Sequence, residues 1–248
     1  MSTPQINNQE GDVAQAFARP DWYLNGYAAN IRTRCETVSF YTKGRTFEHV
    51  LDVGCGDGSL SLPFLGENCR ITFLDLSTGM LERVAARVPE NLRHQTKLLN
   101  GDFTQIDLPP ASFDLVLFVG VLAYVPDVRK IADRIRQVIR PGGLLMTECT
   151  DAGHFFGRLN FSYRDLTSLL RPGKCHTFRH HGSDVVKAFQ SAGFNLRQSF
   201  RYTYSLPLIS RFANQTQAYS LMKRFYGTAE ASRRQRFGSE SLMLFELP

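Results

Sequence analysis

Five short apolar segments recur between residues 48 and 150, and a helix-compatible stretch separates most of them. They cover residues 49–51, 70–75, 97–103, 113–119 and 144–148. Strands that alternate with helices in this way are typical of a mostly parallel sheet with helices on both faces. Ligands of such sheets bind beyond the carboxyl ends of the strands. The sequence therefore predicts a doubly wound α/β fold with its site at that edge.

The first segment runs into a glycine-rich octapeptide, Leu51-Asp-Val-Gly-Cys-Gly-Asp-Gly58. Glycines at alternate positions let the backbone turn tightly and approach a ligand, and a helix predicted from about Ser59 would offer free N–H groups. A dinucleotide fingerprint requires glycine where Ser59 stands. The carboxylate of Asp52 would repel a pyrophosphate but would suit an ammonium group. The pattern favours a cofactor with a cationic end and no phosphate, which describes S-adenosylmethionine.

Acidic residues follow two later segments. Asp75 ends the second segment, 17 residues after Gly58, close to the spacing at which such folds place a carboxylate on ribose hydroxyls. Asp102 and Phe103 end the third and could bind an adenine ring. Each of these residues also has a purely structural alternative. Asp75 could simply end a strand without binding a ligand, Asp102 could form a turn, and Met80 could belong to the core.

Together these motifs resemble the class I S-adenosylmethionine-dependent methyltransferase family, in its small-molecule branch. The similarity is close over residues 48–150. In the rest of the chain only the order of the expected strands and helices is similar. It implies a Rossmann-like, seven-stranded, mostly parallel sheet whose last strand is antiparallel, with a small lid. It implies S-adenosylmethionine as cofactor. The motifs that carry the resemblance are Asp52–Gly58, Leu74–Ser77 with Met80, Gly101–Phe103, Phe113–Val116 and Arg140–Gly143.

The resemblance also assigns roles around the cofactor. Its methionine end would lie on Asp52 and the backbone of Gly54, Cys55 and Gly56, with its amine near Val119. Asp75 would bind the ribose. The adenine would be bound by the residues Leu76, Met80, Asp102 and Phe103.

Residues 1–45 are expected to form an N-terminal helical lid on a methyltransferase domain at 46–248. In this lid Tyr23 or Tyr27 would cover the methyl donor, and Arg32 or Arg34 would meet its carboxylate. An aromatic and basic insertion at about 151–181 is expected to bind the acceptor. A second candidate is an amphipathic helix between residues 200 and 226.

Methyl transfer from a sulfonium is a direct in-line displacement, so the protein mainly aligns donor and acceptor. An acceptor hydroxyl benefits from a base, and histidine is the commonest. His154, just past the fifth segment, ranks first, with Tyr124 after the fourth segment as another candidate. O- or N-methylation of a small molecule is expected, with a hydroxyl favoured.

Charge divides unevenly along the chain. Residues 151–248 carry 14 Lys or Arg against 6 Asp or Glu, net +8, whereas residues 1–150 are net −2. A basic surface suits an acidic or hydrophobic acceptor, or a peripheral contact with an anionic membrane. RNA methylation and a non-catalytic S-adenosylmethionine-binding partner protein remain alternatives. DNA is not expected as a partner, because the motifs of amino- and pyrimidine-methylating enzymes are missing.

The remaining expectations are negative or general. The five cysteines are scattered, so neither a disulfide framework nor a metal site is expected, although Cys175, His176 and His180 lie close in sequence. Neither a signal peptide nor a membrane-spanning segment is expected, and the expected location is cytoplasmic. The oligomeric state is not predicted.

Overall fold

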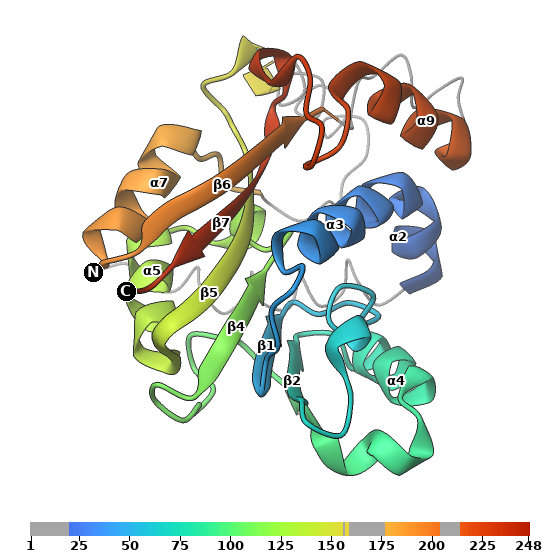
Figure 1. Cartoon of the computed structure of the whole chain (residues 1–248), viewed down its shortest axis with the longest axis vertical. Helices are drawn as coiled ribbons and strands as arrows, with labels where there is room; N and C mark the ends of the chain where they lie inside the picture. Colours follow the sequence, from blue (N-terminus) through green and yellow to red (C-terminus); the bar gives the residue numbers. More distant parts are fainter. Residues whose placement is uncertain (1–19, 156, 159–176, 204–213) are drawn as a thin grey trace, which may run out of the picture.

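A computed structural model describes residues 20–155, 157–158, 177–203 and 214–248. A single seven-stranded sheet runs through the molecule (Figure 1). Its strands are β1 (His49–Val53), β2 (Arg70–Asp75), β3 (Thr96–Asn100), β4 (Phe113–Phe118), β5 (Ile139–Thr150), β6 (Asn195–Tyr202) and β7 (Glu240–Glu246). The α-helices are α2 (Pro20–Gly26), α3 (Ala28–Tyr41), α4 (Thr78–Arg87), α5 (Val128–Val138), α7 (Gly182–Ser191) and α9 (Gln215–Tyr226).

The strand order is β3-β2-β1-β4-β5-β7-β6. Strands β1 to β5 pair in parallel, and β7 lies antiparallel between β5 and β6. The predicted doubly wound α/β fold, with seven strands and an antiparallel last strand, is confirmed. The carboxyl ends of β1, β2 and β4 consequently meet at one edge.

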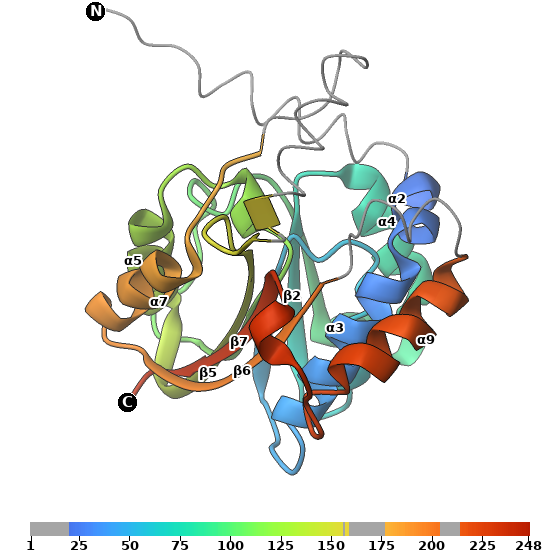
Figure 2. The ribbon, with the colours of Figure 1, turned by 90° about the horizontal axis from the view of Figure 1, so that it is seen from above.

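Helices cover both faces of the sheet (Figure 2). One core contains side chains of α3, α4 and α9 together with Val50, Leu115 and Leu244. The other contains side chains of α5 and α7 with Leu51, Val116 and Phe245. Residues 50 and 51 point to opposite faces because side chains alternate along a strand. Both faces of the central strands are therefore buried, which explains their continuous apolar sequences.

The helix expected after the glycine loop does not form, and this prediction was wrong. The chain turns through residues 57–61 and makes one short 3-10 helix, η1 (Leu62–Phe64). An α-helix starting near Ser59 would need an N–H at residue 63 to bond the Ser59 carbonyl, and Pro63 has none. That carbonyl instead accepts from the Cys35 thiol at 3.4 Å.

Three other boundaries differ from expectation. Strand β5 begins at Ile139 rather than Leu144, so Arg140–Gly143 lie within it. Strand β3 ends at Asn100, which leaves Asp102 and Phe103 in the following loop. Helix α9 begins only at Gln215, after a capping box in which Asn214 and Gln217 bond each other's backbone.

The predicted lid falls partly within the described residues. Helix α3 packs beside α9 on one face of the sheet, and its inner side buries both apolar and polar residues, among them Ala29, Asn30, Arg34 and Val38. Much of the predicted insertion, residue 156 and residues 159–176, lies outside the described residues. No helix within the described ranges is long and apolar enough to cross a membrane.

Candidate functional site

The glycine loop after β1 is held against β2 by its own backbone. The N–H of Gly54 donates to the Leu74 carbonyl at 2.7 Å. Both Gly54 and Gly56 have left-handed backbones, with φ of +65° and +55°. A Cβ on Gly54 would lie 2.5 Å from Val121, whereas a Cβ on Gly56 would point into open space. The loop is therefore closed on one side and offers bare backbone to a ligand on the other.

The carboxylate of Asp75 fastens this loop to the end of β2. One oxygen accepts from the N–H of Gly56 at 2.9 Å, and the other accepts from the N–H of Ser77 at 2.8 Å. Burial raises the pKa of Asp75, while these backbone donors oppose the rise. Each carboxylate oxygen can accept more than one hydrogen bond, so Asp75 keeps acceptor capacity for hydroxyl donors.

Asp52 lies buried beneath the loop, only 3% exposed. Its carboxylate accepts from the Ser61 hydroxyl, and burial raises its pKa to about 7. The neighbouring Cys55 is also buried, and burial raises the pKa of its thiol far above the usual value. Cys55 thus stays protonated at neutral pH and is not a nucleophile.

The residues expected around adenine lie in different environments. Leu76 is half-buried, whereas Met80 is 1% exposed inside α4. Asp102 accepts from the N–H of Thr104 at 2.5 Å and so forms a turn. The Phe103 ring is buried, with its centroid 5.8 Å from that of Phe118. The structure brings these residues to the edge beside β2 and β3, with only part of their surface accessible.

Asn100 is a residue of this edge that the sequence reasoning missed. Its side-chain amide donates to the carbonyls of Asp75 and Leu76, both at 3.0 Å. These bonds tie the end of β3 to the end of β2. The third segment was predicted to run to Phe103, so Asn100 lay inside it and gave no signal of a strand end.

Beyond β4 the chain passes Val119, which is buried, and reaches Gly120. Gly120 has φ +80°, and a Cβ there would lie 3.0 Å from both terminal nitrogens of Arg34. Arg34 also donates to the Tyr23 hydroxyl at 3.3 Å. The structure thereby places two predicted residues, Arg34 and Tyr23, next to the segment that follows β4.

Arg34 is a buried cation that forms an ion pair with Glu148 of β5. Burial opposes its charge, but the Glu148 carboxylate, with Tyr23 and Tyr202, holds the pKa of Arg34 well above its usual range. Its Nε–H is buried and has no hydrogen-bond partner among the described residues. A buried donor without a partner is costly, so this atom is a candidate contact for an acceptor group.

Glu148 belongs to a network that the sequence did not reveal. The Tyr202 hydroxyl of β6 lies 2.5 Å from Glu148 and 2.6 Å from the side-chain oxygen of Asn30. The hydroxyl has one proton, which it donates to the Glu148 carboxylate. It can then accept a hydrogen bond from Asn30 when the oxygen and nitrogen of the Asn30 side-chain amide exchange places. The network joins α3 to β5 and β6 and fixes Arg34.

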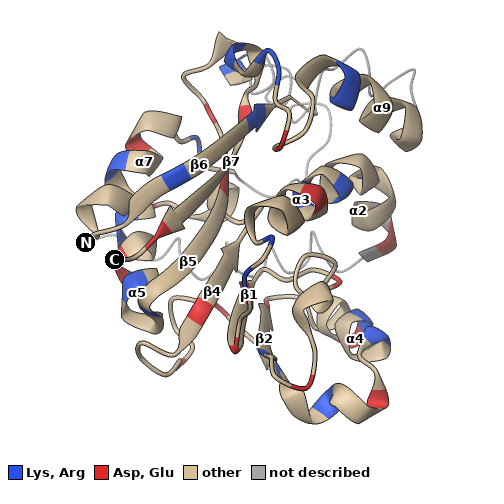
Figure 3. Cartoon of the chain, in the orientation of Figure 1, with Lys and Arg blue, Asp and Glu red and all other residues tan. Residues whose placement is uncertain are grey.

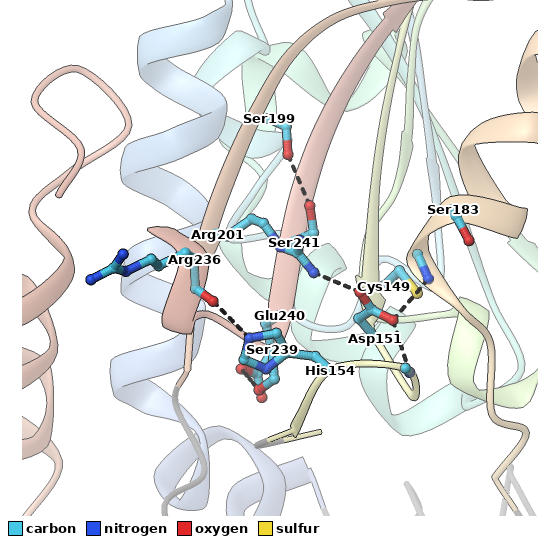
Figure 4. A network of polar contacts seen from close by, with 12 residues as sticks. Cys149, Asp151, His154, Ser183, Ser199, Arg201, Arg236, Ser239, Glu240 and Ser241 are labelled. Atoms are coloured by element: carbon cyan, nitrogen blue, oxygen red, sulfur yellow. Dashed lines mark hydrogen bonds and ion pairs between the residues drawn. The ribbon is translucent and has the colours of Figure 1, made fainter. Parts of the chain in front are cut away.

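His154 lies past the end of β5 (Figure 4). Its Nε2 is 2.8 Å from the Arg236 carbonyl. Because a carbonyl only accepts, Nε2 carries a proton, while Nδ1 is buried. Nearby, Arg201 and the N–H groups of Gly153 and Gly182 bond the Asp151 carboxylate, as Figure 4 shows in part.

Tyr124 ends the short 3-10 helix η3 (Leu122–Tyr124), which follows β4. The segment 178–180 holds η3 in place. Nε2 of His180 donates to the carbonyls of Leu122 and Val125, at 3.1 and 2.9 Å, and the N–H of Phe178 donates to Ala123. His180 therefore has a structural task, and no cluster of metal-ligating side chains occurs within the described part of the chain.

The chain resembles known proteins over this same region. Residues 51–147 match the family model described as a methyltransferase domain. A malonyl-[acyl-carrier protein] O-methyltransferase from Serratia marcescens is 32% identical over 148 residues, which are 60% of this chain and 55% of the relative. A ubiquinone biosynthesis O-methyltransferase from Idiomarina loihiensis is 32% identical over 123 residues, covering 50% and 47% of the two chains. The matches thus span about half the length of these relatives.

A solved structure extends the likeness to the whole fold. Magnesium protoporphyrin IX methyltransferase from Synechocystis PCC 6803 superposes with a TM-score of 0.65 at 15% identity, covering 97% of this chain and all of that one. At this identity the comparison supports the fold alone. Sheet order, matched domain and relatives agree: residues 51–147 carry a methyltransferase domain, and the sheet has the strand order that the resemblance to class I S-adenosylmethionine-dependent methyltransferases implies.

Proposed function

We propose that the chain transfers a methyl group from S-adenosylmethionine to a hydroxyl of a small-molecule acceptor. One observation carries this proposal. The open side of Gly56, the Asp75 carboxylate and the Arg34 guanidinium over Gly120 come from distant parts of the sequence and lie at one edge of the sheet. Ligands of parallel sheets bind at this edge.

The residues present fit the cofactor. Arg34, whose Nε–H has no partner among the described residues, would pair with the carboxylate of the methionine end, and Gly54, Cys55 and Gly56 would contact that end through their backbone. Asp75 would accept hydrogen bonds from the ribose. The bound cofactor supplies a methyl group already activated on a sulfonium. Asp52, the Val119 segment and Tyr23 would surround the methionine end, while Leu76, Met80, Asp102 and Phe103 would flank adenine.

The two relatives named above are both O-methyltransferases, which supports oxygen as the acceptor atom. In this chain the base would be His154, which lies past the end of β5, or Tyr124, which follows β4. Residues 1–45 would act as the lid and residues 151–181 would bind the acceptor. Because the methyl group is activated, the protein's contribution is alignment together with removal of the hydroxyl proton.

Calorimetry with S-adenosylmethionine and S-adenosylhomocysteine tests the first step, and a labelled-methyl assay with small hydroxyl-containing molecules tests the second. We expect binding of both ligands and transfer to an oxygen. Absence of binding would refute the proposal. Transfer to RNA would favour the RNA methyltransferase alternative, and cofactor binding without transfer to any acceptor would favour a non-catalytic binding protein.

The role of Arg34 has its own test, because decarboxylated S-adenosylmethionine lacks the group that Arg34 would bind. Arg34→Gln should weaken binding of S-adenosylmethionine by about 10- to 100-fold, the range for hydrogen bonds between charged groups. The same variant should bind the decarboxylated analogue as the wild type does. Equal losses for both ligands would show that Arg34 only supports the fold.

A further inference from the structure

Two large apolar side chains are exposed one turn apart on α9. Leu221 is 49% exposed and Phe225 is 42% exposed. They lie on the outer side of the helix, since its inner side packs into the core beside α3 through Ala218, Tyr219, Met222 and Tyr226. Exposed apolar side chains scattered singly are normal, but two adjacent ones on one helix face form the beginning of a contact surface.

The segment that carries this apolar pair is basic. Residues 214–238 contain five Lys or Arg and one acid, Glu230, net +4. Among the described residues, Lys223 pairs with Glu36, whereas no ion pair involves any of the other four cations. We call Leu221 and Phe225 with these four cations the α9 patch. The four cations are Arg224, Arg233, Arg234 and Arg236.

The patch is an ordered arrangement rather than a loose collection. Arg234 has a left-handed backbone with φ +46°, which is uncommon outside glycine. Its guanidinium lies 4.9 Å from the Phe225 ring centre, and that of Arg236 lies 4.8 Å from the ring centre of Phe237. The chain therefore holds one cation beside the exposed Phe225 ring and another beside the half-buried Phe237 ring.

The patch lies toward the end of the molecule at which the parallel strands finish. Figure 3 shows Lys and Arg on α9 and on the short helix η4 (Gln235–Phe237) at this end. Phe155, five residues after the carboxyl end of β5, is 67% exposed. Two other leucines among the described residues are exposed, Leu98 on β3 and Leu196 on β6.

We propose that the α9 patch docks onto the surface of an anionic phospholipid bilayer. Such a bilayer would bind both kinds of side chain in the patch. The negative headgroups attract the cations, and the boundary of the acyl chains buries the apolar side chains. An RNA partner would use the cations and could stack a base on Phe225, but Leu221 offers no ring for stacking. This inference does not depend on methyl transfer.

Sedimentation of the full-length protein with vesicles tests the proposal. Vesicles of phosphatidylglycerol and phosphatidylcholine should bind the protein, and vesicles of phosphatidylcholine alone should not. The bound fraction should fall as salt rises. Replacing Arg233, Arg234 and Arg236 by Gln should reduce the partition coefficient about a hundredfold, since each cation near an anionic surface contributes about fivefold.

A second variant separates apolar insertion from charge. Leu221→Ser with Phe225→Ser leaves the net charge unchanged and should lower partitioning about tenfold. Matched controls are Leu98→Ser with Leu196→Ser, and Arg129→Gln with Lys130→Gln on α5, which should bind as the wild type does. Circular dichroism checks that each variant is folded.

Three results would overturn the proposal. The first is no preference for anionic vesicles, and the second is wild-type partitioning by both folded patch variants. The third is tight, salt-sensitive binding to single-stranded RNA, lost in the arginine variant, without vesicle binding. That outcome would assign the patch to nucleic acid.

Discussion

The guanidinium of Arg34 lies directly over Gly120, with both of its terminal nitrogens 3.0 Å from the position that a Cβ would occupy. Helix α3 and the segment after β4 meet at this contact. Two features therefore require glycine at position 120. One is its left-handed backbone, with φ of +80°, and the other is the guanidinium of Arg34, which leaves no room for a Cβ.

Gly120→Ala should consequently reduce stability by more than backbone strain alone would, because the added Cβ also collides with Arg34. Gly44 is a matched control, because its φ is +77° and a Cβ there meets nothing within 4 Å. Gly44→Ala should cost about 1 to 2 kcal/mol in free energy of unfolding, the penalty of a left-handed backbone. Gly120→Ala should cost more and should also weaken S-adenosylmethionine binding. Equal losses of stability in urea unfolding would contradict this account of Arg34.

Glu148→Gln should destabilise the protein by about 3 to 5 kcal/mol, because it leaves the buried Arg34 charge without its partner. The exposed pair of Arg197 and Glu246, with atoms 2.7 Å apart, provides the comparison. Arg197→Gln should cost less than about 1 kcal/mol, as surface pairs do. Chemical unfolding at neutral pH measures both, and similar losses would show that Glu148 is not an essential counter-charge.

Asp52 should make stability depend on pH. Its pKa rises from an ordinary value near 4 in the unfolded chain to about 7 in the folded protein. The folded state therefore binds the proton more tightly, so this contribution is fully present below about pH 4 and is lost as pH rises through 7. Between these limits the slope approaches about 1.4 kcal/mol per pH unit.

Asp52→Asn should remove that slope. Urea unfolding of both proteins at pH 5 and pH 7.5 measures it, because the titration of all other groups cancels in the difference between them. A difference between wild type and variant that stays constant with pH would be incompatible with a raised pKa.

Asp75→Ala should weaken S-adenosylmethionine binding by about 10- to 100-fold, since hydrogen bonds from ribose hydroxyls to a charged group would be lost. The variant also removes the acceptor for the Gly56 N–H, which fixes the glycine loop. Calorimetry measures the affinity. Asp107→Ala, at an exposed position, serves as control, and unchanged affinity in Asp75→Ala would refute the ribose role.

His154→Ala should lower kcat by about 10²- to 10⁴-fold if His154 removes the acceptor proton, while leaving cofactor affinity unchanged. His94, an exposed histidine beside the amino end of β3, provides the control. A labelled-methyl assay across pH measures the effect. Wild-type turnover in the variant would direct attention to Tyr124 or to an acceptor that loses its proton unaided.

The parallel core of the fold could be predicted from the sequence because its central strands, β1, β2 and β4, are buried on both faces and read as continuous apolar segments. The residue range of strand β6 was not recognised. Its first four residues are all exposed, and a register shift between Leu196 and Gln198 interrupts the alternation that marks a strand. Its place in the sheet followed only from the family resemblance.

The site divides in a similar way. Asp75 and the glycine loop are local features at strand ends, so their positions could be predicted. The network of Arg34, Glu148 and Tyr202 could not, because it pairs residues from α3, β5 and β6 that only the finished fold brings together. Glu148 and Tyr202 each stand alone in the sequence and look like ordinary strand residues.

The place of β7 between β5 and β6 has a consequence for synthesis on the ribosome. Tyr202 of β6 pairs with Glu240 of β7, 38 residues later, and β7 is the strand partner of β6 within the described sheet. At about 5 to 20 residues per second, β6 waits roughly 2 to 8 s for that partner to be made. During this interval both β5 and β6 present open hydrogen-bonding edges, which are the places where nascent chains aggregate or recruit chaperones.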